Sequence, residues 1–177
     1  TLVFGTAPGT GTNSIARTST NETSFVLDLG GKTITTGLEN VDDPSRHKYA
    51  IHNYANLTII GQGAINARGI KNFGTMTIDG DITIKNVDTN GGAAIWNEGD
   101  VTINGGTFIS GEPGTIVENS YGAALNTRPS EEKETKAIVN GGTFIAYSQL
   151  TYAIINEGET IINNAIVKGR HGAVAGA

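Results

Sequence analysis

Four pairs of closely spaced carboxylates are the residues of this 177-residue chain best suited to chemistry. The pairs are Asp42 with Asp43, Asp79 with Asp81, Glu98 with Asp100, and Glu157 with Glu159. Hydrolysis of a sugar chain uses two carboxyl groups roughly 5 to 9.5 Å apart, on either side of the bond that breaks. Solvated carboxylates at a glycine turn are nevertheless the ordinary case, because charged residues are rarely buried. The sequence therefore predicts no catalytic residue.

Other reactive or metal-binding side chains lack the partners that their chemistry needs. The chain has no cysteine, which excludes a thiol nucleophile, a thiolate metal site and a disulfide framework. The three histidines do not have the spacing of metal ligands; they are His47, His52 and His171. Glu39, Asp42 and Asp43 lack the glycine-spaced oxygen pattern of a calcium loop. We therefore predict neither a metal nor a cofactor.

Composition and charge narrow the class of protein. The net charge is −5 and the 12 basic residues are scattered, which argues against nucleic acid as a partner. No apolar run is long enough to cross a bilayer, so membrane insertion is not expected. The 25 glycines, together with abundant Thr, Ile and Asn, are typical of short strands joined by tight turns.

Internal repeats must position these side chains. The stretch Ala94 to Gly111 reads AIWNEGDVTINGGTFISG, and copies of its frame begin at Ala50, Gly69 and Ala153, with a broken copy between Ala123 and Ile145. The apolar runs are too short for helices with a period of 3.6 residues. We expect one all-β domain of about six parallel coils over residues 24–177, with residues 1–23 as an N-terminal cap.

One asparagine of the frame recurs in every copy. The positions are Asn53, Asn72, Asn97, Asn126 and Asn156, with spacings of 19, 25, 29 and 30 residues. Coils stacked at about 4.8 Å, the spacing of neighbouring strands, bring equivalent side chains within hydrogen-bonding reach. We predict a ladder in which these five amides satisfy one another.

The same alignment predicts three apolar columns and one outward column. The first column is Ile51, Ile70, Ile95, Ala124, Ile154 and Val174; the second is Leu29, Ile59, Ile78, Ile103, Val139 and Ile162; the third is Ile34, Ile65, Phe108, Phe144 and Ile166. The register of residues 82–84 is open by one residue. Trp96, Leu125 and Ile155 fall on the outward column. They predict an apolar stripe, covered either by the chain's own loops or by a partner.

The segments LDLGGKTIT, LTIIGQGAI and VTINGGTF resemble the repeats of the pectate-lyase-like superfamily. That resemblance implies a single-stranded right-handed parallel β-helix, or solenoid. The superfamily includes polysaccharide lyases and hydrolases, phage tailspikes and fibres, and bacterial surface proteins. Gly169-Arg170-His171-Gly172 is similar to an element of pectin-cleaving hydrolases, but the accompanying Asn-x-Asp and paired Asp are missing.

The leading functional hypothesis is a non-enzymatic structural or binding protein of a virion or bacterial cell surface, such as a phage fibre, tailspike, decoration protein or adhesin. The alternative is a polysaccharide lyase or glycoside hydrolase on the same scaffold. Expected partners are a surface polysaccharide and other protein subunits, and the expected location is extracellular, on a cell surface or on a virion. The predicted binding residues are aromatic, because aromatic rings stack on sugars and anchor protein partners; they are Tyr49, Trp96, Tyr121, Tyr147 and Tyr152.

The C-terminal segment Ala173 to Ala177 begins a further coil and carries no polar cap. Uncovered strand edges and apolar ends invite pairing with another chain. The sequence therefore predicts that the stack continues in further sequence or packs in an assembly.

Overall fold

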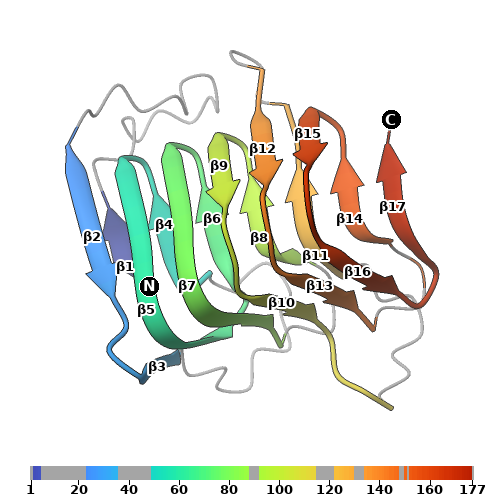
Figure 1. Ribbon diagram of the computed structural model, residues 1–177, viewed down its shortest axis with the longest axis horizontal. Helices are drawn as coiled ribbons and strands as arrows, with labels where there is room; N and C mark the ends of the chain where they lie inside the picture. Colours follow the sequence, from blue (N-terminus) through green and yellow to red (C-terminus); the bar gives the residue numbers. More distant parts are fainter. Residues whose placement is uncertain are drawn as a thin grey trace, which may run out of the picture.

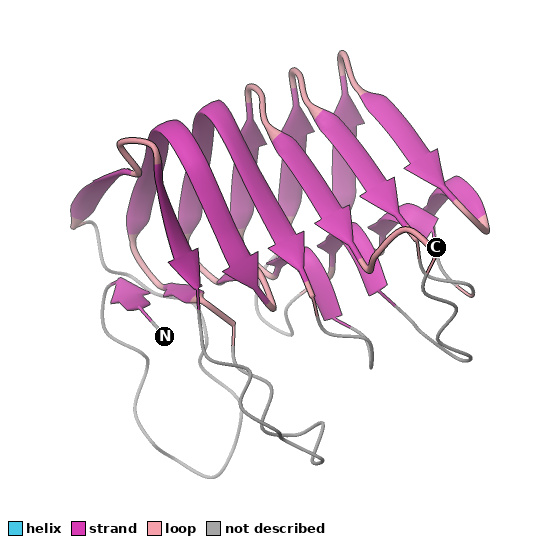
Figure 2. Ribbon diagram, turned by 90° about the horizontal axis from the view of Figure 1, so that it is seen from below, coloured by secondary structure: helices cyan, strands magenta, loops and turns pink. Residues whose placement is uncertain are grey.

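The computed structural model describes residues 2–4, 23–35, 49–87, 92–114, 122–129, 134–147, 150 and 152–176. Every regular element in these ranges is a β-strand (Figure 2). No helix long and apolar enough to span a membrane occurs within them. The strands lie side by side in chain order along the long axis of the molecule (Figure 1).

A seven-stranded parallel sheet forms one side of the molecule. In spatial order it contains β1 (Leu2–Phe4), β4 (Ile51–Asn53), β6 (Ile70–Asn72), β8 (Gly92–Asn97), β11 (Gly122–Thr127), β14 (Tyr152–Asn156) and β17 (Gly172–Gly176). Each repeat contributes one strand. Of the predicted N-terminal cap, residues 2–4 pair with β4 at the edge of this sheet, and residues 5–22 lie outside the described part.

A ten-stranded parallel sheet forms the opposite side and curls around the core. It contains β2 (Ser24–Asp28), β3 (Lys32–Thr35), β5 (Asn56–Ala67), β7 (Thr75–Asn86), β9 (Asp100–Ile103), β10 (Thr107–Ser110), β12 (Lys136–Val139), β13 (Thr143–Ala146), β15 (Glu159–Ile162) and β16 (Ile166–Gly169). Strands β5 and β7 pair over their full length of 12 residues. β9 pairs with the first part of β7 and β10 with its last part.

The prediction of a single-stranded right-handed β-helix is wrong. The second and third strands predicted for each coil belong to one sheet, because β5 and β7 run through both positions without a break. The result is two parallel sheets, of which the ten-stranded one is curled, instead of a three-sided coil. The sequence pattern identified the short apolar runs correctly but could not show that a glycine between two of them bends a strand without ending it.

The bend in β5 and β7 depends on a pair of glycines. Gly61 and Gly80 are register partners, and Gly61 has a φ of 86°, a conformation that residues with a side chain rarely adopt. A Cβ atom added to Gly80 would lie 2.2 Å from the carbonyl oxygen of Gly61. The two strands can therefore bend together only because neither residue carries a side chain.

The core lies between the two sheets. It includes Ile51, Ile70 and Ile95 from the first predicted column, and Ile59, Ile78, Ile103 and Val139 from the second. Phe108 and Phe144 are fully buried and stack with ring centroids 4.8 Å apart. Residues 82–84 adopt one register, in which Ile84 pairs with Ile65 and Phe108, and both Ile82 and Ile84 are buried.

Two core predictions require correction. Leu125, not Ala124, pairs with Ile95 and Ile154, so the leucine occupies the apolar column. Val167, not Ile166, pairs with Phe144. In the last repeat the predicted core positions are also less covered than expected: Ile162 is 40% exposed and Val174 is 47% exposed.

A buried ladder joins Asn53, Asn72 and Asn97, and we call it the inner ladder. The side-chain NH₂ of Asn53 donates to the Oδ1 atom of Asn72 at 2.7 Å, and that of Asn72 donates to Asn97 at 2.8 Å. Asn126 does not continue it. Because Leu125 turns inward, Asn126 pairs with Trp96, and Thr127 takes the ladder position between Asn97 and Asn156.

The cost of this shift is visible in the hydrogen bonding. Among the described residues, the Oδ1 atom of Asn126 and the hydroxyl of Thr127 are buried without a hydrogen-bond partner. Burying a leucine side chain stabilises a protein by about 1.5 to 3 kcal/mol, and each buried polar group left without a partner costs about 1 to 3 kcal/mol. The observed register of β11 buries Leu125 in the apolar column and interrupts the ladder at Thr127.

Candidate functional site

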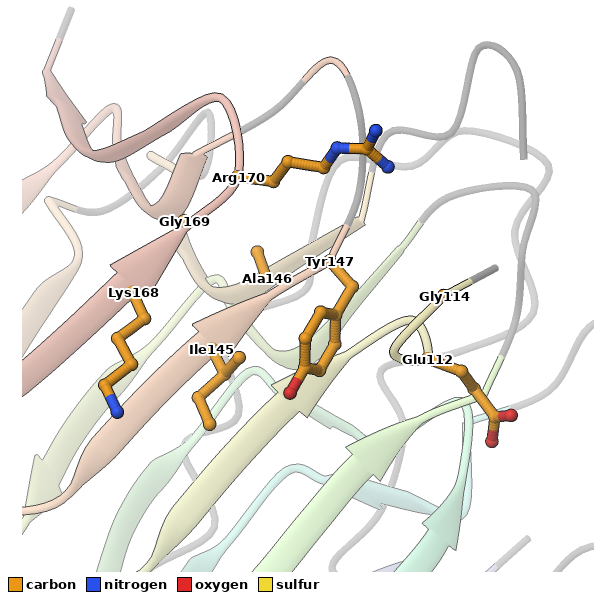
Figure 3. A pocket seen from close by; sticks show the side chains of 8 residues that line it. All are labelled: Glu112, Gly114, Ile145, Ala146, Tyr147, Lys168, Gly169 and Arg170. Carbon is orange, nitrogen blue, oxygen red and sulfur yellow. The ribbon is translucent and has the colours of Figure 1, made fainter. Parts of the chain in front are cut away.

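A groove lies where strands β10, β13 and β16 end, on the outer side of the ten-stranded sheet (Figure 3). It encloses about 590 Å³, within the size range of small-ligand sites. Its lining residues are Glu112, Gly114, Ile145, Ala146, Tyr147, Lys168, Gly169 and Arg170. We refer to this feature as the groove.

Strand geometry places Tyr147 in the groove. Residue 147 follows the end of β13, and its backbone N–H donates to the carbonyl oxygen of Ser110 at 2.9 Å. The corresponding residue of the preceding repeat is Gly111, which has no side chain. Ile145 supplies apolar surface next to the half-buried tyrosine ring, whereas the Ala146 methyl group points away from it (Figure 3). The arrangement resembles a platform: a flat ring beside an apolar floor, open on one side.

Of the three charged residues that line the groove, Glu112 forms an ion pair in the described part of the chain. Glu112 forms an ion pair with Lys85, with 2.5 Å between Oε1 and Nζ. The hydrogen bond from Lys85, together with its positive charge, lowers the pKa of the Glu112 carboxyl below its ordinary value. Lys168 and Arg170 are both exposed, and within the described residues neither takes part in an ion pair.

Sequence reasoning identified Tyr147 but missed Glu112 and Lys168, and it considered Arg170 only as part of the segment Gly169-Arg170-His171-Gly172. Lys168 pairs with Ile145 in the register of β13 and β16, and Arg170 follows in the row of Tyr147. That neighbourhood follows from the alignment of the repeats. The sequence therefore already indicated this pair of cations, because Lys168 aligns with Ile145 of the preceding repeat and Arg170 aligns with Tyr147.

The structure places the other predicted binding residues elsewhere. Tyr49 is buried, with Arg68 5.1 Å from its ring centroid. Tyr152 contacts His171 edge to face at 5.1 Å. Tyr121 lies outside the described residues. The predicted tyrosines are thus not gathered at one site in the described part of the chain.

Trp96 is held in a polar cluster on the outer face of the seven-stranded sheet. Its indole N–H donates to Glu98 at 2.6 Å, and Lys71 and Arg128 lie 5.5 and 5.1 Å from its ring centroid. Cations at such distances from an indole ring are favourable contacts. The predicted stripe of Trp96, Leu125 and Ile155 is not formed, since Leu125 is buried in the core and Asn126 takes the position beside Trp96.

Two of the carboxylate pairs considered for catalysis contain a glutamate that forms an ion pair, and the other two pairs are exposed or lie outside the described residues. Glu98 lies 3.3 Å from Lys71, and Glu157 lies 3.1 Å from Arg128. Arg128 occupies the row between the two glutamates. Asp79 and Asp81 are exposed on the bend of β7. Asp42, Asp43, Glu39 and His47 lie outside the described residues.

The described residues contain no group of three or more His, Asp or Glu side chains that could hold a metal ion. Among the described residues that line the groove, Glu112 is the one carboxylate, and Lys85 already pairs with it. In that part of the chain the groove thus offers an aromatic ring, an apolar floor and two unpaired cations. This combination can bind a ligand but does not supply the two carboxyl groups that sugar hydrolysis uses.

Comparison of the chain with models of protein families, with curated proteins and with solved structures finds no match in any of the three. The likeness to pectate-lyase-like repeats therefore has no support beyond the sequence segments that suggested it. No residue role is transferred from that superfamily.

Proposed function

We propose that this protein is a non-enzymatic binding module that holds a saccharide in the groove around Tyr147. The observation that carries the proposal is the position of the Tyr147 ring beside the apolar surface of Ile145. A sugar ring has an apolar face of C–H groups, and aromatic side chains with a polar tip bind such amphipathic ligands. Hydroxyls of the sugar would meet the polar and charged rim.

Binding is favoured over cleavage by the state of the carboxylates. A general acid must be able to release a proton near neutral pH, and enzymes raise the pKa of such a group. The pKa of Glu112 is shifted in the opposite direction. A polysaccharide lyase or hydrolase remains the alternative, and a location on a cell surface or virion would suit a glycan-binding role.

The test compares two tyrosine variants on a glycan array. Tyr147→Ala should lose binding to the glycans that the unaltered protein retains. Tyr152→Ala is the matched control, because Tyr152 contacts His171 and is not among the residues that line the groove. Circular dichroism checks that both variants fold. Binding that survives Tyr147→Ala would refute the proposal, and release of shorter sugar chains from a bound polysaccharide would favour the enzymatic alternative.

A further inference from the structure

Two cations line the groove, and Figure 3 shows their side chains pointing in different directions. Lys168 lies in β16 opposite Ile145, and the backbone N–H of Arg170 donates to the carbonyl oxygen of Ala146 at 3.1 Å. This register fixes where both side chains leave the backbone. Because strands β13 and β16 are paired neighbours, the backbones of both residues lie one strand away from Ile145 and Tyr147.

Elsewhere on the surface, cations and carboxylates of different repeats pair with each other. Examples are Lys71 with Glu98, Lys85 with Glu112, Arg128 with Glu157, and Lys136 with Glu159. Within the described residues, Lys168 and Arg170 depart from this arrangement, since neither has a carboxylate partner. They are therefore available to an anion. The planar guanidinium of arginine also matches the two oxygens of a carboxylate or sulfate group.

The groove is electrostatically asymmetric. Figure 3 shows Glu112 and Lys168 on opposite sides of the Tyr147 ring. Lys85 pairs with the Glu112 carboxylate and offsets part of its charge. An acid group on a ligand would be attracted to Lys168 or to Arg170, and not to the Glu112 carboxylate. One orientation of an acidic ligand is thus preferred.

We infer that the ligand of the groove is an anionic saccharide whose acid groups bind Lys168 and Arg170 while a sugar ring rests against Tyr147. This inference rests on the proposed function, to which it adds the chemical class of the ligand. Carboxylate and sulfate groups share the required chemistry. Tyr147 contacts the sugar ring, and Lys168 and Arg170 contact the acid groups. Mutation can therefore separate the contribution of the ring to affinity from that of the charge.

The experiment uses an array of neutral, carboxylated and sulfated oligosaccharides, followed by titration calorimetry on the strongest ligand. Lys168→Gln and Arg170→Gln should each weaken binding about tenfold, the loss expected when one charge-assisted contact is removed. Lys32→Gln is the matched control: Lys32 is an exposed lysine of β3 that is not among the residues lining the groove, and its loss should leave affinity unchanged. Methyl esterification of a carboxylated ligand should reproduce the loss, and the sulfated arm shows which acid group is preferred.

The outcomes separate this inference from the proposed function. Binding that depends on Tyr147 but is equally tight for neutral or esterified sugars would overturn the anionic ligand and leave the binding function standing. Binding of anionic sugars that is insensitive to Lys168→Gln and Arg170→Gln would also overturn it. If no oligosaccharide binds in a Tyr147-dependent way, both the inference and the proposed function fail.

Discussion

The side chain of Asn72 makes four hydrogen bonds that contribute to the stability of the fold. It is fully buried, accepts a hydrogen bond from Asn53, and donates to Asn97 and to the carbonyl oxygens of Gly74 and Asp100. The backbone contacts fix the orientation of the amide, so its neighbours in the ladder must face the same way. Removal of this side chain leaves buried polar groups without partners, which costs more than the bonds themselves contribute.

Asn72→Ala is therefore expected to lower the free energy of unfolding by about 2 to 4 kcal/mol. The measurement is equilibrium unfolding in urea. The control is Asn140→Ala, because Asn140 also bridges two asparagines, Asn104 and Asn163, but is exposed and can exchange its partners for water. A loss of similar size in both variants would show that burial is not the cause.

The interrupted ladder offers a stabilising substitution. Thr127 is fully buried between Asn97 and Asn156, and its hydroxyl has no hydrogen-bond partner in the described part of the chain. Thr127→Asn would place an amide where both neighbours have amides, and we expect a gain of about 1 kcal/mol in the free energy of unfolding. Thr127→Val removes the hydroxyl without extending the ladder, so it separates the two effects. Destabilisation by Thr127→Asn would show that the site is too narrow for an amide.

His52 makes the stability depend on pH. Burial lowers the pKa of its imidazole below the ordinary value of 6.5, and the positive charge of Lys71 lowers it further. As the pH falls through 6.5, the unfolded chain takes up a proton that the folded chain refuses, so stability falls with pH until the folded pKa is reached. His52→Gln should show a shallower loss of melting temperature over this window. An NMR titration of His52 with a midpoint at or above 6.5 would contradict the prediction; in Lys71→Gln the midpoint should rise.

At the scale of the element, the bend of β5 and β7 depends on the close approach of Gly61 and Gly80. Gly80→Ala would bring a methyl group against the Gly61 carbonyl oxygen and force the two longest strands apart. We expect a cost of about 2 to 4 kcal/mol in the free energy of unfolding. Gly105→Ala is the matched control from the next repeat, where an added Cβ atom would stay 3.3 Å from the nearest backbone oxygen. Thermal unfolding of both variants, followed by circular dichroism, measures the difference.

Much of the strand arrangement was predictable from the sequence, because β-branched runs at matching positions indicate parallel neighbours in register. Ile51, Ile70 and Ile95 do stack as predicted. The continuity of β5 and β7 was not predictable, since glycine is compatible with both a corner and a bend. The shift at Leu125 was missed because the sequence alignment matched Asn126 to Asn97, which placed Leu125 outside the core. Tyr147 was found as a single aromatic residue, but the groove depends on residues of β13 and β16 and of the segment that follows β10.

At the scale of the whole molecule, stability depends on contacts between neighbouring repeats. Phe108 and Phe144 come from adjacent strands of one sheet and stack inside the core. Phe108→Ala should lower the free energy of unfolding by about 3 to 5 kcal/mol, the usual cost of truncating a buried aromatic side chain. Val26→Ala, at a side chain that is 68% exposed, should change it by less than about 0.5 kcal/mol. Denaturant unfolding of the two variants under one set of conditions tests this contrast.

The pairing of β5 with β7 over their full length also has a consequence for how the length of such a chain can change in evolution. Residues 56 and 75 are partners, as are residues 53 and 72, so both sheets advance by the same 19 positions (75 − 56 and 72 − 53). Duplication or loss of one such segment in the gene would add or remove a complete layer while every remaining strand kept an equivalent neighbour. The length of the protein can thus change in whole units, and a site formed by later strands such as β13 and β16 would pass through such events unaltered.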